Sequence, residues 1–154
     1  MSVETINISY CTFTLGDLHL GVPVTEIQEV IRAQVRTRVP LVSSVINGLI
    51  NLRGELVTTV DLRARFGLPP IAPGTESMNV VVRRDDGAVS ILVDEIRDVI
   101  DVAAADFEPV PSMFSGPCRD LMTGIYKLDD SLLLVLDIDK LLDVPAALRD
   151  EVHA

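Results

Sequence analysis

The chain has 154 residues, of which 48% are apolar, and its 13 Lys and Arg against 23 Asp and Glu give a formal net charge of −10. A chain of this length can bury a core without disulfide or metal staples, which excludes a disordered or fibrous protein. The acidic balance argues against nucleic-acid binding, because phosphate contacts need clustered Lys and Arg. With no run of about 18 apolar residues and no signal-peptide pattern, we expect a cytoplasmic protein without membrane insertion.

The first half of the chain predicts a hairpin followed by shorter elements. Apolar and β-branched residues flank Gly16-Asp17, a turn signal, and predict strands over Tyr10–Leu15 and Leu18–Val24. The segment through Ile31 fits either a helical turn or a strand. The remaining predicted elements are an extended piece ending at Pro40, a loop or short helix reaching Gly48, a strand over Glu55–Leu62 and a short helix over Arg63–Phe66.

The second half predicts the same order of elements. Its hairpin has strands over Met78–Arg83 and Ala88–Val93 around Asp85-Asp86-Gly87. After it we expect a segment through Ile100, an extended piece ending at Pro111, a loop or short helix to Gly124 that includes a long loop over Ser112–Asp120, a strand over Ser131–Ile138 and a short helix over Asp139–Leu142.

This parallel order reflects an internal repeat. Residues 24–31 recur as residues 93–100 with an offset of 69 residues and five of eight positions identical, and residues 48–61 align with residues 124–137 at an offset of 76. Two copies are too few for a repeat array. We therefore predict one domain over 1–154 with pseudo-repeats at about 10–70 and 78–145, a linker at 71–77 and a tail at 146–154.

The fold class predicted from these elements is mainly β, with two small five-stranded barrels and short helices. Short strands bounded by Gly and Pro favour barrels over a parallel sheet. Because each copy is thin as an independent domain, we expect the copies to share a hydrophobic seam, and strands can be exchanged between the barrels. Positions that stay apolar in both copies are interpreted as core: Ile27 and Ile96, Val30 and Val99, Leu52 and Leu128, Leu56 and Leu132.

Few residues suggest chemistry. Cys11 and Cys118 match no paired metal-ligand spacing, and His19 is expected to face solvent. No glycine-rich phosphate loop, nucleophile elbow or His-Glu metal pair occurs, so we predict no catalytic residue, no metal and no cofactor. Asp61 and Asp137 repeat at the end of a predicted strand, where we expect them to cap the following helix, although an acid pair for catalysis is the alternative.

One divergent position stands out between the copies. Asn51-Leu52-Arg53-Gly54 aligns with Lys127-Leu128-Asp129-Asp130. A turn needs only Gly, Asp or Asn here, so Arg53 is surplus to it. Its guanidinium offers a fork of donors for a carboxylate, and a solvated turn arginine is the alternative interpretation.

The sequence resembles the CheW family of chemotaxis adaptor proteins. The resemblance covers about residues 10–145 and is carried by residues 13–16, Ile27-Gln28-Glu29-Val30, Val39-Pro40, residues 48–54, residues 60–62, residues 92–94 and residues 135–142. It implies a non-enzymatic scaffold of two SH3-like barrels that couples chemoreceptors to the regulatory domain of a CheA-type histidine kinase. By position it implies a receptor-binding site at Ile27, Glu29, Asn51, Leu52 and Arg53, in which Glu29 pairs with Arg53 and orients it.

The expected receptor partner is the cytoplasmic tip, a helical hairpin, because an apolar groove with a few polar groups at its rim suits an amphipathic helix. The protein would then lie in the cytoplasm at membrane-anchored receptor arrays. Three alternatives are open at this point: an adaptor in a non-flagellar pathway for pilus motility or gene regulation, a small acidic enzyme using a carboxylate near Glu26 or Asp61, and a ligand-binding barrel.

Overall fold

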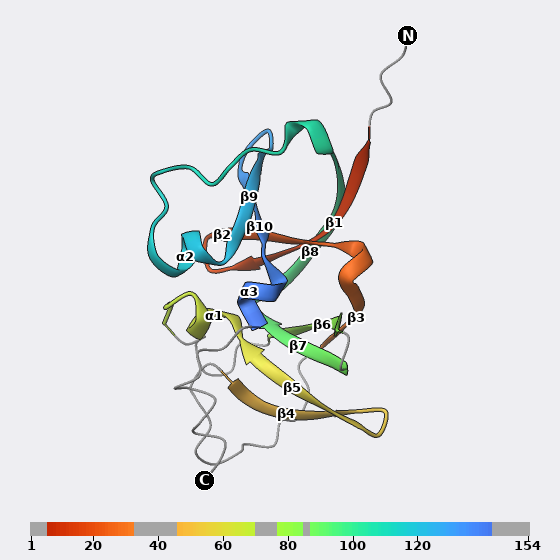
Figure 1. The fold of residues 1–154 in the computed structure, drawn as a ribbon. Coiled ribbons are helices and arrows are strands. Elements are labelled where there is room, and N and C mark those ends of the chain that lie inside the picture. The colour runs from red at the N-terminus through yellow and green to blue at the C-terminus, as the bar shows by residue number, and fades with distance from the viewer. Residues whose placement is uncertain (1–5, 33–45, 70–76, 85–86, 143–154) are drawn as a thin grey trace.

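The computed structural model describes residues 6–32, 46–69, 77–84 and 87–142. Within these ranges the chain forms ten strands and a few short helices (Figure 1). The predicted tail at 146–154, residues 71–76 of the predicted linker, the extended piece ending at Pro40 and the Asp85-Asp86 turn lie outside the described residues.

The first pseudo-repeat follows the predicted order closely. Its elements are β1 (Asn7–Leu15), β2 (Leu18–Pro23), the 3₁₀ turn η1 (Val24–Glu26), β3 (Ile27–Arg32), β4 (Ile46–Leu52), β5 (Glu55–Asp61) and α1 (Leu62–Arg65). The first hairpin is confirmed, with Leu15 paired to Leu18 across its turn. The segment that fitted either a helical turn or a strand contains both, because η1 runs directly into β3.

The described elements of the second pseudo-repeat are β6 (Met78–Arg84), β7 (Gly87–Val93), β8 (Glu95–Ala103), η2 (Ala104–Asp106), α2 (Gly116–Asp120), β9 (Met122–Lys127), β10 (Leu132–Leu136) and α3 (Ile138–Leu142). They include the corresponding strands and closing helix, but the 3₁₀ turn follows β8 and a further helix, α2, precedes β9. The long loop expected over Ser112–Asp120 is wrong at its end, where α2 forms.

The loop or short helix expected before Gly124 is confirmed by α2, but the expectation missed the strands β4 and β9 that precede the closing strands. Strand β9 contains Gly124, and β4 likewise contains a glycine, which lowers strand propensity. Gly124 is needed because the chain passes very close to its neighbours. A Cβ at Gly124 would lie 2.2 Å from Cζ of Phe107 and 2.5 Å from the carbonyl oxygen of Glu108.

The ten strands form two five-stranded sheets that exchange hairpins. One sheet has the order β8-β1-β2-β10-β9 and the other has the order β3-β6-β7-β5-β4. The hairpin of each pseudo-repeat thus lies between strands of the other, joined by an antiparallel pair on one side and a parallel pair on the other. We call the first sheet barrel A and the second barrel B. Since neither pseudo-repeat completes a sheet alone, the strand exchange left open by the sequence takes place.

The largest core cluster is shared by the two sheets, which lie one above the other in Figure 1. Equivalent positions of the two hairpins meet there, among them Phe13 with Val82 and Val22 with Ile91, all fully buried. The predicted hydrophobic seam is therefore confirmed. Two positions interpreted as core are wrong: Leu56 is 69% exposed and Val99, on the edge strand β8, is 61% exposed.

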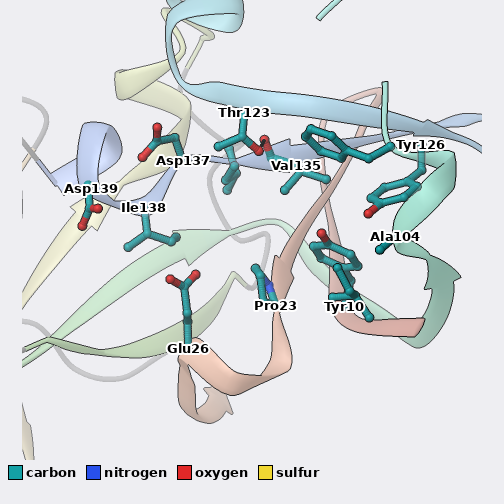
Figure 2. Close-up of a pocket in the computed structure, with 13 residues that line it drawn as sticks. Tyr10, Pro23, Glu26, Ala104, Thr123, Tyr126, Val135, Asp137, Ile138 and Asp139 are labelled. Carbon is teal, nitrogen blue, oxygen red and sulfur yellow. Dashed lines mark hydrogen bonds between the residues drawn. The ribbon is translucent and has the colours of Figure 1, made fainter. Parts of the chain in front are cut away.

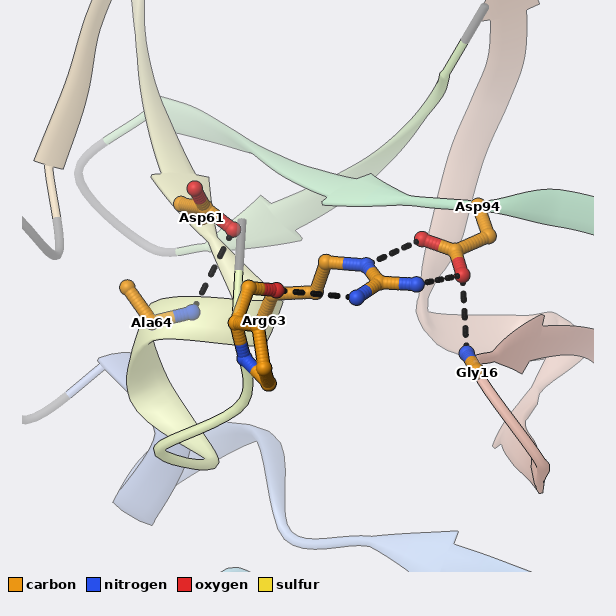
Figure 3. A network of polar contacts seen from close by, with 6 residues as sticks. Gly16, Asp61, Arg63, Ala64 and Asp94 are labelled. Carbon is orange, nitrogen blue, oxygen red and sulfur yellow. Dashed lines mark hydrogen bonds and ion pairs between the residues drawn. The ribbon is translucent and has the colours of Figure 1, made fainter. Parts of the chain in front are cut away.

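A polar network also joins the two pseudo-repeats beside α1 (Figure 3). The guanidinium of Arg63 donates to both carboxylate oxygens of Asp94, at 2.8 and 2.6 Å, and Asp94 Oδ2 also accepts from the Gly16 N–H at 2.7 Å. Because the charged form of Asp94 receives these hydrogen bonds, above all from Arg63, its pKa is lowered. Nearby, Asp61 accepts from the Ala64 N–H at 3.3 Å, which confirms its predicted capping role.

We expect Gly124→Ala to lower the free energy of unfolding by about 2 kcal/mol, because the added methyl group must displace Phe107 and the Glu108 backbone. For a chain of this length the midpoint of thermal unfolding should fall by roughly 6 °C. Thr123→Ala, at an exposed neighbour on β9, is the control and should change stability by less than about 0.5 kcal/mol. Equal stability of both variants would contradict the close approach at Gly124.

The Asp94 network predicts a pH-dependent loss of stability. Since the folded-state pKa of Asp94 lies below its ordinary value of 3.8, the network stabilises the fold above that pH and its contribution disappears as the pH falls through the folded-state value. Asp94→Asn should therefore cost about 1–2 kcal/mol at pH 7, and this cost should shrink as the pH is lowered below 3.8 and Asp94 becomes protonated in the folded protein, as measured by urea unfolding over a pH series. Asp130→Asn, in the exposed turn before β10, should show no such difference.

Candidate functional site

The site predicted from the sequence centres on the turn between β4 and β5. Leu52 pairs with Glu55, so the turn consists of Arg53 and Gly54, whose φ angles are 52° and 88°. Two successive positive φ angles are typical of a type I′ hairpin turn, which matches the twist of the strands. Asn51 supports this turn, because its side-chain oxygen accepts from the Gly54 N–H at 2.9 Å.

Arg53 adopts a backbone conformation that glycine or asparagine fills more easily. Among the described residues it is the one non-glycine residue with a positive φ. Such a conformation is uncommon for a residue with a long side chain and carries a modest energetic cost. Retention of arginine here, where the turn itself would prefer another residue, points to a role for its side chain.

The guanidinium of Arg53 forms a bidentate ion pair with Glu29, which confirms the pairing expected from the resemblance. Nη1 donates to Oε2 at 2.6 Å and Nη2 donates to Oε1 at 2.8 Å. The side chain of Arg53 is 73% exposed, whereas that of Glu29 is 18% exposed. The partly covered carboxylate therefore fixes the direction of an arginine that stands in solvent.

This ion pair also joins the two edges of barrel B. Glu29 lies on β3 and Arg53 follows β4, and these are the first and last strands of the five-stranded sheet. The two edges can meet only if the sheet curls on itself. In barrel A the corresponding closure is made by backbone, because the N–H and carbonyl groups of Glu108 and Ile125 exchange hydrogen bonds of 2.9 and 2.8 Å.

The other predicted site residues divide into two groups. Asn51 and Leu52 lie at the end of β4 beside the turn. Ile27 does not share their surroundings: a bulge between Ile27 and Glu29 places Ile27 opposite Val82, and its side chain packs against the shared core. A period of two along β3 would have put Ile27 and Glu29 on one face, and the bulge breaks that period.

One residue of this corner was missed because of its apolar character. Leu56 pairs with Asn51 in the register of β4 and β5 and is exposed. Its equivalent in the second pseudo-repeat, Leu132, packs against the shared core. Because both equivalent positions hold leucine, the sequence suggested that both are buried. The exposed corner consists of Asn51, Arg53 and Leu56, and Glu29 lies beneath it.

The other residues that the sequence offered as candidates for chemistry have roles or positions within the fold. Asp137 accepts from the Lys140 N–H at 3.2 Å and caps α3 as predicted. His19, expected to face solvent, instead has a buried Nε2 without a hydrogen-bond partner among the described residues, and burial lowers its pKa. Within the described residues no three or more His, Cys, Asp or Glu side chains are grouped so that they could hold a metal ion. In the same part of the chain, no helix is long and apolar enough to cross a bilayer.

Comparison with known proteins decides the family. The family model described as the CheW-like domain matches residues 9–146. This chain belongs to the CheW-like family. It is 30% identical over 139 residues to the chemotaxis protein CheW of Klebsiella aerogenes, with 90% of this chain and 84% of that protein covered. It is also 31% identical over 131 residues to the chemotaxis protein CheW of Bacillus subtilis, with 85% and 84% covered.

A solved structure shares the fold. The scaffolding protein TtCheW of Thermoanaerobacter tengcongensis superposes with a TM-score of 0.82 at 25% sequence identity, covering 90% of this chain and 94% of that one. The predicted fold class is confirmed: the chain is mainly β and has the CheW-like arrangement of two SH3-like barrels.

The Glu29–Arg53 pair predicts a measurable shift. Hydrogen bonds from Arg53 hold the pKa of Glu29 below its ordinary value of 4.5. In Arg53→Gln the pKa of Glu29 should rise toward that value, as followed by carbon-detected NMR titration of the carboxyl group. Arg97→Gln removes an arginine paired with Glu95 and should leave the pKa of Glu29 unchanged. An unaltered Glu29 pKa in Arg53→Gln would show that the pair does not form in solution.

Proposed function

We propose that this protein is a non-enzymatic adaptor that couples chemoreceptors to a CheA-type histidine kinase in chemotaxis. Two kinds of evidence support the proposal. Curated relatives that match most of the chain are named chemotaxis protein CheW, and the similar solved structure is that of a scaffolding protein. The family model matches residues 9–146, so the similarity extends over both barrels and is not limited to one motif.

The observation that carries the proposal is the solvent-facing guanidinium of Arg53, held in a strained turn by Glu29. An arginine whose direction is fixed in the unbound protein loses less side-chain entropy when it binds a partner carboxylate. Beside it, the exposed Leu56 supplies apolar surface. Arginine and apolar anchors together are typical of the centre of a protein interface.

In this proposal the receptor-binding residues have different tasks. Arg53 contacts the receptor tip, a helical hairpin, while Glu29 and Asn51 hold the arginine and its turn in position. Leu52 contributes apolar surface at the end of β4, and Ile27 supports β3 from the core side.

The domain organisation and location follow from the same proposal. The pseudo-repeats at 10–70 and 78–145 act as one unit, because their exchanged hairpins prevent either from working alone. The protein acts in the cytoplasm at receptor arrays, where its receptor partner supplies the membrane anchor. Relatives named for chemotaxis favour that pathway over pilus motility or gene regulation.

Charge reversal at Arg53 tests the proposal. Arg53→Glu should reduce co-sedimentation with receptor-containing membranes at least about tenfold, because it places a carboxylate beside Glu29 and toward the partner carboxylate. The variant should still fold, with a somewhat lower midpoint of thermal unfolding, because it loses the ion pair across the edges of barrel B while the backbone pairing of the sheet remains.

Lys127→Glu is the matched control for this experiment. Lys127 is 68% exposed, carries the same charge and lies at the equivalent hairpin of barrel A. It should leave co-sedimentation with receptors unchanged. Equal capture of the Arg53→Glu and native proteins by the membranes would refute the receptor-binding role of the corner, and failure of the native chain to bind either receptor or kinase would refute the adaptor function itself.

A further inference from the structure

A cavity of about 570 Å³ opens at one end of barrel A and has no part in the Arg53 corner (Figure 2). Its walls come from both sides of the junction between the barrels. Pro23 and Glu26 belong to the crossing from β2 into η1, and Asp137, Ile138 and Asp139 belong to the start of α3. Its volume is within the range of cavities that bind ligands or partner side chains.

The floor of the cavity is aromatic. The ring centroids of Tyr10 and Tyr126 are 5.5 Å apart, and Phe107 meets Tyr126 edge-to-face at 5.4 Å. Burial and a side-chain hydrogen bond with Tyr126 raise the pKa of Tyr10, so this phenol stays neutral at physiological pH. Aromatic faces of this kind attract cations that carry an apolar stem.

The rim of the cavity is acidic. Three carboxylates line it, and the lining contains no Lys or Arg. Asp139 forms an ion pair with Arg84, and Asp137 caps α3. Glu26 forms no ion pair with any other described residue, and Figure 2 shows its carboxylate directed toward the cavity from η1, with Asp137 on the opposite side.

The internal repeat allows the cavity beside α3 to be compared with the equivalent position beside α1 in the first pseudo-repeat. At offsets of 69 and 76 residues, Ile8, Pro23, Asp137 and Asp139 of the cavity correspond to Ser77, Leu92, Asp61 and Arg63. Those four residues line the matching place beside α1, where the free volume is only about 20 Å³.

The two places differ in the charges that they hold: Arg63 corresponds to Asp139, and its partner Asp94 corresponds to Thr25. Beside α1 the guanidinium of Arg63 occupies the space and binds Asp94 through two hydrogen bonds. Beside α3 the corresponding residue is Asp139. The position that carries a guanidinium beside α1 therefore carries a carboxylate beside α3. The second place therefore has an acidic lining without an arginine, and Arg84 pairs with Asp139 from outside that lining.

We propose that the cavity beside α3 binds an arginine side chain of a partner protein, with the guanidinium at Glu26 and Asp137 and the stem on the aromatic floor. The bound group brings to this cavity a guanidinium like the one that Arg63 supplies beside α1, with Glu26 and Asp137 as its carboxylate partners in place of Asp94. This inference does not depend on the receptor-binding role of the Arg53 corner, because none of the corner residues lines the cavity.

An NMR titration of the isotopically labelled full chain tests the proposal, with Nα-acetyl-arginine methylamide as the probe and its citrulline analogue as the neutral isostere. The arginine compound should shift the amide resonances of Ala104, Thr123 and Tyr126 in a saturable manner, and the citrulline compound should not. Glu26→Gln should weaken binding of the arginine compound by about tenfold, because one charged partner is lost.

Two further variants complete the design. Glu95→Gln changes the equivalent glutamate of the second pseudo-repeat, which is outside the cavity lining, and should leave the affinity unchanged. Asp139→Arg restores the residue found at this position beside α1 and should reduce binding by at least about tenfold, since it brings a positive charge to the cavity. Equal binding of the citrulline compound, or unchanged affinity in Glu26→Gln and Asp139→Arg, overturns the proposal.

Discussion

The fold depends on one constraint: each pseudo-repeat must bury its hairpin in the sheet of the other. A hairpin alone is marginally stable in water, and a three-stranded remainder exposes two edges. Exchange resolves both problems at once, because every hairpin gains two neighbours and the apolar faces of both hairpins meet in one core. Duplication therefore yielded a single cooperative unit, and the main-chain pairing between copies is the interaction on which the other features rest.

Closure of the two barrels follows from that arrangement but uses different chemistry in each. Barrel A brings its edges together with paired backbone groups at Glu108 and Ile125, and barrel B does so with the side chains of Glu29 and Arg53. The closure of barrel A uses backbone groups that are already hydrogen-bonded to each other, so these groups are not free to bind a partner. A side-chain bridge leaves a charged group at the surface whose direction is already set, and this is the property on which the proposed receptor-binding role of Arg53 rests.

Some of these features could be predicted from the sequence and others could not, and the reasons are physical. Hairpins and the shared seam could be predicted because alternation and turn residues are local signals. Strand β9 could not, because Gly124 is dictated by the distant contact with Phe107. The position of Ile27 depended on a bulge, which one extra residue creates without a compositional signature. The cavity beside α3 is lined by residues from seven elements, so no single sequence motif predicts it.

The pattern of divergence between the copies has a physical cause. Positions in the shared core contact residues of both copies, so Phe13 and Val82 are constrained to stay apolar. Strand ends lie outside this core, and there the copies differ in charge: arginine against aspartate at positions 53 and 129, and again at positions 63 and 139. Changes at these places alter what the surface presents without disturbing the seam. Two barrels of one fold thus have an outward guanidinium at one end and an acidic cavity at another, so that a scaffold with internal symmetry has an asymmetric surface.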